Sequence, residues 1–257
     1  MSASVIISFM SIILATSIIS PPVFAKRNKA EPTAKTTQQT SPATPSQPVG
    51  DAPMVEANEQ TIKYVITSKP SEEKFEQVTM MTSRTLIAGE NSTELKNVSH
   101  GLRKIAVFGL VPVRGYTLQL LAANPEKLVR TEDGFLASLK DAGPVQLRMT
   151  FLRDLPGQKV ADSFKEGLEA NKIRTRSMSP ELAAVMSEVA SIKKFTKDES
   201  YSITALWKAN QVTLLLEDSM QIKAFNGSPA LAENILSIWF GKPADSKLKD
   251  LKVALIK

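Results

Sequence analysis

Arg103 is the residue whose chemical type and sequence setting best suit the binding of an anion. It lies in "SHGLRKIAVFGL" (99–110), where we expect a polar turn to lead into an apolar strand. A guanidinium is planar, always charged and able to hold both oxygens of a carboxylate. At the mouth of an apolar cleft, Arg103 would therefore bind an oxyanion. The local sequence alone favours the alternative, a surface arginine beside Lys104.

Most catalytic and metal sites are excluded by composition. The chain has no cysteine and one histidine, His100, so disulfides, thiolate sites, Cys/His nucleophiles and multi-histidine metal sites cannot form within it. The sequence contains no G-x-S-x-G, G-x-G-x-x-G or Walker motif. We expect no metal and no cofactor. His100 stands beside Gly101 and is predicted to be a turn or surface histidine, not a catalytic base.

The charge pattern does not indicate nucleic-acid binding. The chain carries a formal net charge of +6, all of it on residues 61–257, and its basic residues are scattered. A nucleic-acid-binding surface usually clusters them in a patch or along one helix. We expect the charge to serve solubility, with binding of an acidic ligand or peripheral contact with an anionic membrane as the alternative.

The first 60 residues read as an exported leader and a tether. Residues 1–25 contain the apolar run "VIISFMSIILATSII" followed by "SPPVFA", which is typical of a cleaved signal peptide. The alternative is an uncleaved membrane anchor, because the run is only slightly shorter than a spanning helix. Export without cysteine favours a bacterial periplasm. Residues 26–60 are rich in Thr, Pro and Gln and are predicted to be a disordered linker, which leaves 61–257 as one domain.

Hydrophobic periodicity within the domain predicts an α+β fold. Alternating or β-rich runs predict strands, and amphipathic runs with cap signals predict helices. Strands are expected in 61–68, 73–89 (one or two, with a turn near 89–91), 100–122 (two, broken near 109–112), 145–154 and 200–227 (three, with turns at 209–210 and 217–218). Helices are expected in 132–143, 155–172 and 179–195, and two more in 226–252. This order predicts an open-faced antiparallel sheet covered on one face by helices.

The helix that contains Trp239 is predicted to be deeply packed. Ser228 is a candidate N-cap, Pro229 suits the first helical position, and Gly241 ends the helix. Large apolar side chains up to Trp239 form one stripe, and burying each stabilises the fold by ~1.5–3 kcal/mol. We expect this helix to lie across a curved sheet, with no second sheet over it.

Three segments resemble successive landmarks of the bacterial chalcone isomerase-like family. They are "HGLRKIAVFGLVPVRGYTLQLL", "VQLRMTFLRDLPGQKVADSFKEGLEANK" and "FNGSPALAENILSIWFGKPADSKLKDLK". The family typically shows a G-L-R turn before a strand pair, then F-L-R-D before a helix with E-G-x-x-A-N. It closes with a helix ending in I-W-x-G, then P-x-D and a Lys/Leu-rich helix. The resemblance covers roughly residues 85–257.

This resemblance implies a large antiparallel sheet, a helical layer and an apolar cleft between them. Plant enzymes of the family close a flavanone ring, with a site that positions the substrate and stabilises charge. The family's site arginine falls on Arg103. The Tyr or Thr that usually follows falls near 111–113, where Pro112 cannot donate; Tyr116 is offset by a few positions, and a helix hydroxyl is replaced at about Ile238.

The incomplete enzyme set favours a binding function. Related plant members without activity bind fatty acids with the same Arg and a Tyr. We therefore expect an exported, non-catalytic binder of a fatty acid or similar amphiphile, in which Arg103 holds the head group and Tyr116 assists. The alternatives are an isomerase (intramolecular lyase) acting on a chalcone-like enone with Arg103 as its site residue, and a structural envelope protein. In the structural protein the cleft would be filled and Arg103 paired with an internal carboxylate.

Overall fold

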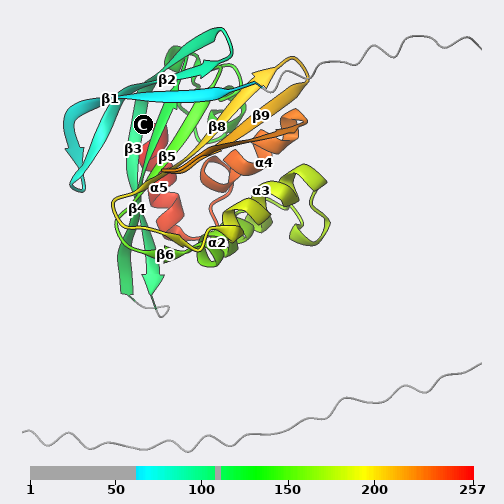
Figure 1. The fold of residues 1–257 in the computed structure, drawn as a ribbon. Coiled ribbons are helices and arrows are strands. Elements are labelled where there is room, and N and C mark those ends of the chain that lie inside the picture. Colours follow the sequence, from blue (N-terminus) through cyan, green and yellow to red (C-terminus); the bar gives the residue numbers. More distant parts are fainter. Residues whose placement is uncertain (1–61, 108–110) are drawn as a thin grey trace, which may run out of the picture. The chain divides into compact units, whose positions relative to one another are not determined.

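The computed structural model describes residues 62–107 and 111–257 (Figure 1). The side chains of 106 and 107 are not described, and the predicted signal peptide (1–25) and linker (26–60) lie outside these residues. No helix in the described ranges is long and apolar enough to cross a membrane.

An eight-stranded antiparallel sheet forms the centre of the domain. Its strands pair in the order β1-β2-β3-β4-β5-β8-β9-β10, so hairpin neighbours in sequence are also neighbours in the sheet. A separate two-stranded ribbon joins β6 to β7. The strands are β1 (Tyr64–Phe75), β2 (Val78–Ala88), β3 (Asn91–Val107), β4 (Val111–Ala122), β5 (Val145–Phe151), β6 (Leu155–Pro156), β7 (Lys194–Phe195), β8 (Ser200–Lys208), β9 (Gln211–Glu217) and β10 (Ile222–Gly227).

The sheet is curled, and its first strands lie against the face that the helices leave open (Figure 1). Regular pairing of β2 with β3 starts only at Ser83 opposite Lys96. In the part of β2 before Ser83, a side chain of β4 bonds to the strand backbone. The Gln119 amide oxygen accepts from the Met81 N–H at 3.1 Å, and the Gln119 amide nitrogen donates to the Met81 carbonyl at 2.7 Å. β2 therefore crosses the sheet and brings Arg84 within 2.7 Å of Glu217 on β9.

Five α-helices and two single-turn 3₁₀ helices complete the described chain. The α-helices gather on the other face of the sheet, where α2 packs against α3 and α4, and α5 packs along β3. They are α1 (Phe135–Ser138), α2 (Gly157–Ala170), α3 (Pro180–Ser191), α4 (Pro229–Phe240) and α5 (Ser246–Ile256); the 3₁₀ helices are η1 (Pro125–Lys127) and η2 (Thr175–Ser177).

Two glycines allow this close packing. A Cβ at Gly101 would lie 2.6 Å from Leu251 Cδ1, so a glycine on β3 lets α5 settle on the strand. A Cβ at Gly167 would lie 2.8 Å from Ile238 Cγ2, which explains why the E-G-x-x-A-N helix carries glycine where α2 meets α4. Both contacts are closer than a real side chain allows.

The Trp239 helix is buried as predicted. Trp239 is 1% exposed and meets the Phe164 ring edge-on, with 5.1 Å between ring centroids. The helix ends at Gly241, and Ser228 occupies the N-cap position. The predicted N-cap position is thus confirmed, but the Ser228 hydroxyl makes no cap bond, and the Leu231 N–H bonds to the Ser228 carbonyl.

Most of the predicted elements are confirmed, with corrections. The first strand runs to Phe75, so the first hairpin turns inside the expected strand 73–89, and the two-residue strands β6 and β7 lie at the edges of the expected helices 155–172 and 179–195. The helix expected in 132–143 is only the four residues Phe135–Ser138, with turns on both sides. The polar turn expected before Arg103 is also wrong. β3 begins at Asn91 and pairs with β4 from Lys96 onward, so His100 and Arg103 both lie inside a long paired strand. Ser99 and Gly101 suggested a turn, but Gly101 is needed for close approach of α5.

Candidate ligand-binding site

A cavity of about 620 Å³ lies between the sheet and α2. Arg103 and Tyr116 line it from β3 and β4, and Val160 and Phe164 line it from α2. Its volume falls within the range of small-molecule sites, roughly 300–1,000 Å³. Trp239 is not part of this lining. The helix α4 instead forms the core beneath Tyr116, where Trp239 donates to the Tyr116 hydroxyl, and α2 supplies the wall.

Arg103 and Tyr116 face each other across neighbouring strands. A register shift between Arg103 and Lys104 places Tyr116 directly opposite Arg103, and Arg114 opposite Lys104. This irregularity in the hairpin compensates for the offset of a few positions between Tyr116 and the place where the family usually has its Tyr or Thr. Residues 111–113 instead pair with 105–107, further out on the hairpin. Pro112 is tolerated there because the pairing of β4 with β5 begins only at Tyr116.

Asp245 holds the Arg103 guanidinium in a two-pronged ion pair. Arg103 Nη1 donates to Asp245 Oδ1 at 2.8 Å, and Nη2 donates to Oδ2 at 2.5 Å. The arginine side chain is 8% exposed and the aspartate side chain 43%. Asp245 is also the N-cap of α5, since its Oδ1 accepts from the Leu248 N–H at 2.8 Å.

These contacts fix both groups in their charged forms. Burial opposes the charge on each, but the hydrogen bonds with Arg103 and the Leu248 N–H lower the pKa of Asp245 overall. Burial likewise opposes the charge on Arg103, but the bond to Asp245 raises its pKa overall. The sequence reasoning missed Asp245, although the aspartate of P-x-D directly before a helix is a recognisable cap signal.

Tyr116 presents a hydroxyl proton that no described residue accepts. Its oxygen accepts a hydrogen bond from Trp239 Nε1 at 3.0 Å, and this is its one hydrogen bond among the described residues. Burial raises the pKa of Tyr116, although the Arg103 charge and the Trp239 bond oppose the rise. The phenol is therefore a neutral donor at the edge of the cavity.

The charges around the cavity do not make it strongly cationic. Its lining has three cationic side chains, Arg103, Arg153 and Lys159, against four carboxylates, Asp154, Asp162, Glu166 and Asp245. Asp154 accepts hydrogen bonds from the Lys197 N–H at 2.8 Å and from Lys194 Nζ at 2.9 Å. These two bonds lower the pKa of Asp154.

His100 lies outside this cavity. Its ring packs on Phe75 with 4.5 Å between centroids, its Nε2 is 3.5 Å from Glu73 Oε1, and its buried Nδ1 has no partner in the described chain. It is part of the packing between β1 and β3. Within the described ranges, no group of His, Asp and Glu side chains could hold a metal ion.

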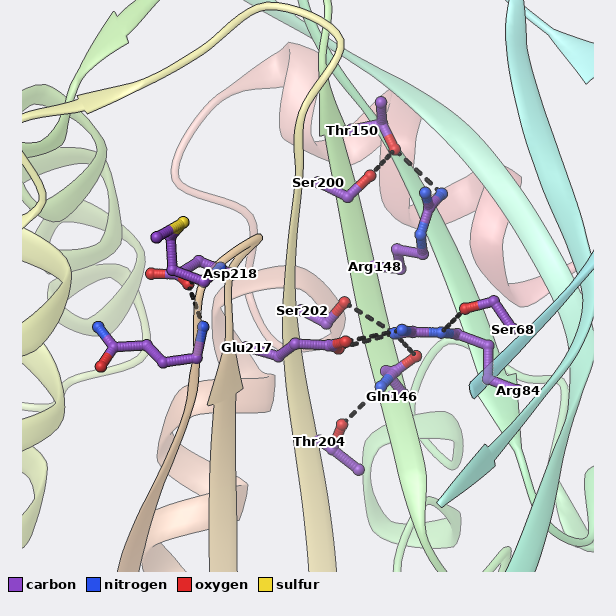
Figure 2. A network of polar contacts seen from close by, with 12 residues as sticks. Ser68, Arg84, Gln146, Arg148, Thr150, Ser200, Ser202, Thr204, Glu217 and Asp218 are labelled. Atoms are coloured by element: carbon purple, nitrogen blue, oxygen red, sulfur yellow. Dashed lines mark hydrogen bonds and ion pairs between the residues drawn. The ribbon is translucent and has the colours of Figure 1, made fainter. Parts of the chain in front are cut away.

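A second polar cluster lies on the other face of the sheet, as Figure 2 shows. Arg84 donates to both oxygens of Glu217, at 2.8 and 2.7 Å, and to Gln146 at 2.8 Å. Arg148 donates to Thr150 at 3.1 Å; burial and the nearby Arg84 charge lower the pKa of Arg148 to about 10. Gln146, Arg148 and Thr150 are at alternate positions of β5, and Gln146 contacts Arg84 of β2.

Comparison with known proteins agrees with this fold. The crystal structure of a fatty-acid binding protein of Arabidopsis thaliana matches with a TM-score of 0.54 and 18% sequence identity, over 73% of this chain and 96% of that chain. At that identity the match shows a shared fold. None of the curated proteins matches the sequence significantly.

A family profile covers most of the domain. The profile described as chalcone isomerase-like matches residues 91–251, more than half of the chain and close to the 85–257 expected from the motifs. The curled antiparallel sheet with its helical layer is the fold that the resemblance implied. The chain therefore belongs to the chalcone isomerase-like family.

Proposed function

We propose that this protein binds a single-chain amphiphile, such as a fatty acid or a similar lipid, in the cavity between the sheet and α2. The observation that carries the proposal is the placement of Arg103 and Tyr116 side by side on the wall of one cavity of about 620 Å³. The apolar side chains of Ile105, Val160 and Phe164 line the same space and would contact the hydrocarbon tail. The head group would lie at Arg103 and Tyr116.

Binding is favoured over isomerase chemistry by the groups that are missing from the lining. The enzymes' helix hydroxyl corresponds to about Ile238, which is buried against Gly167 and does not line the cavity. Residues 111–113 are Val-Pro-Val, so they carry no strand hydroxyl, and none of them belongs to the lining. Arg103 and Tyr116 are then the polar pair left from that set.

Native mass spectrometry combined with titration tests the proposal. The purified protein should carry or take up one molecule of 1-dodecanol or dodecanoate. Ser163→Trp adds a large ring to the α2 wall and should weaken binding at least tenfold by filling the cavity. Ser187→Trp on the exposed face of α3 is the matched control and should bind like the wild type. A protein that takes up neither probe would contradict the proposal.

A structural role in the cell envelope is the second candidate, and the Arg103–Asp245 pair favours it. An arginine that is satisfied internally needs no ligand. The open volume beside the pair favours the binder. The two roles differ in one measurement: a structural protein stays empty with every amphiphile and loses nothing when Ser163→Trp fills the cavity.

We also propose that the protein is exported to the periplasm after removal of residues 1–25. The support is the apolar run followed by the small residues Val23 and Ala25. Mass determination of the mature protein from a bacterial periplasmic extract tests this. An intact N-terminus in a membrane fraction would support the uncleaved anchor instead.

A further inference from the structure

We propose that Asp245 makes the cavity selective for an amphiphile with a neutral, hydrogen-bonding head group, such as a hydroxyl, and against a free carboxylate. This inference rests on the proposed function, because it concerns the head group of the same ligand, and it narrows the ligand from fatty acids and similar lipids to amphiphiles with a neutral head group. It assigns a specificity role to a residue that the sequence reasoning did not single out.

A carboxylate of the protein itself already binds Arg103. Both terminal nitrogens of Arg103 already donate to the two oxygens of Asp245, at 2.8 and 2.5 Å. This is the geometry in which a guanidinium binds a carboxylate most strongly. An acid head group would find the two-pronged edge of the guanidinium occupied and would have only the remaining N–H groups of Arg103 to bind.

A ligand carboxylate at this site would also be repelled by the acidic side chains around Arg103. A ligand carboxylate at Arg103 would share one guanidinium with Asp245 and would also lie near Glu166, whose charge already acts on Arg103. Like charges at such distances disfavour each other's ionised forms. Protonation of Asp245 does not relieve the conflict near neutral pH, because its contacts hold it ionised. A neutral head group meets no such repulsion.

Hydrogen bonds from α5 fix Asp245 in place. Its side chain accepts from the Leu248 N–H at 2.8 Å, and its carbonyl accepts from the Lys249 N–H at 3.0 Å. Moving Asp245 aside would uncap α5, and losing an N-cap destabilises a helix. The carboxylate is therefore part of the cavity wall and not a loose side chain that a ligand displaces freely.

The cavity wall still offers a ligand head group one hydrogen-bond donor and one acceptor. The Tyr116 hydroxyl proton has no acceptor among the described residues, so it can donate to a ligand oxygen. Arg103 and the Leu248 N–H use three of the roughly four lone-pair sites of the Asp245 carboxylate, so Oδ2 can accept one hydrogen bond from a ligand hydroxyl. An alcohol satisfies both groups at once, whereas an ionised carboxylate has no proton to donate to Asp245.

The test compares 1-dodecanol with dodecanoate at pH 8, where the acid is ionised, by titration calorimetry. The wild-type protein should bind dodecanol at least tenfold more tightly than dodecanoate. Asp245→Asn removes the charge but keeps a residue that caps helices equally well, so the domain should fold. It should bind dodecanoate at least tenfold more tightly than the wild type. Asp250→Asn, an exposed carboxylate elsewhere on α5, is the control and should leave the preference unchanged.

The outcomes separate this inference from the function beneath it. If the wild type binds dodecanoate as tightly as dodecanol, and Asp245→Asn changes neither affinity, Asp245 does not set specificity and the binding function stands. If neither probe binds the wild type or Asp245→Asn, both proposals fail. The wild-type comparison alone decides the inference should the variant not fold.

Discussion

The carboxylate of Asp245 accepts hydrogen bonds from both terminal nitrogens of Arg103, although the two residues lie 142 positions apart in the sequence. One contact thereby joins β3 to the start of α5 at the edge of the cavity. It satisfies a buried cation, caps a helix and shapes the candidate site. Consequences for stability and for binding both follow from this single pair.

Replacing Asp245 by alanine should lower the free energy of unfolding by about 1–3 kcal/mol. The change leaves Arg103 without its charged acceptor and removes the cap of α5. The value is kept below that of a fully buried pair because Asp245 is 43% exposed and solvent screens the interaction. Urea unfolding followed by circular dichroism measures it. Asp250→Ala should cost less than half as much, and equal costs would show that the pair adds no stability.

The contribution of Asp245 should depend on pH in the acidic range. Its pKa is lower in the folded protein than the ordinary value of 3.8, so the stabilisation is fully present above that value. It is lost as the pH falls through the folded pKa. The difference in unfolding free energy between wild type and Asp245→Asn should therefore be constant near neutrality and shrink below pH 3.8. A difference that stays unchanged down to pH 2 would contradict the charged pair.

Tyr116→Phe should cost about 1–3 kcal/mol of unfolding free energy, because it leaves the buried Trp239 N–H without an acceptor. Tyr201→Phe is a matched control within the same core. The Tyr201 hydroxyl is buried and has no partner among the described residues, so its removal should be neutral or stabilising. Thermal or urea unfolding of both variants checks the contrast, and equal losses would overturn it.

Arg84→Met should destabilise the domain by about 3–5 kcal/mol, because it leaves Glu217 without its partner between β2 and β9 (Figure 2). Arg114→Met breaks the exposed pair with Glu76 and should cost less than about 1 kcal/mol. A double-mutant cycle with Glu217→Gln measures the coupling directly. A coupling near zero would mean that the curl of the sheet does not depend on this pair.

Much of the fold could be predicted from the sequence because its signals are local. The turns at Ala209-Asn210 and Glu217-Asp218 separate β8, β9 and β10 in the predicted way, and Gly241 ends α4. The curl of the sheet could not be predicted. It depends on Gln119 bonding to β2 and on Arg84 reaching β9, contacts between residues far apart in sequence.

The candidate site could be predicted only in part, because its assembly also depends on contacts between residues far apart in sequence. Arg103 and Tyr116 were both named from the sequence, but their direct opposition depends on a register shift that no periodicity reveals. Asp245 was missed because an acidic N-cap is usually explained by its own helix. Only the folded chain shows that the same oxygens also bind Arg103.

Locating a bound amphiphile on the protein shows whether the cavity beside Arg103 and Tyr116 is a binding site. A 1-dodecanol analogue with a photoreactive diazirine in its chain should react once per molecule, and peptide mapping should place the adducts in α2, at or beside Val160 and Phe164. Excess dodecanol should suppress the reaction. Adducts that are scattered over the surface, or that persist in Ser163→Trp, would contradict a binding function for this cavity.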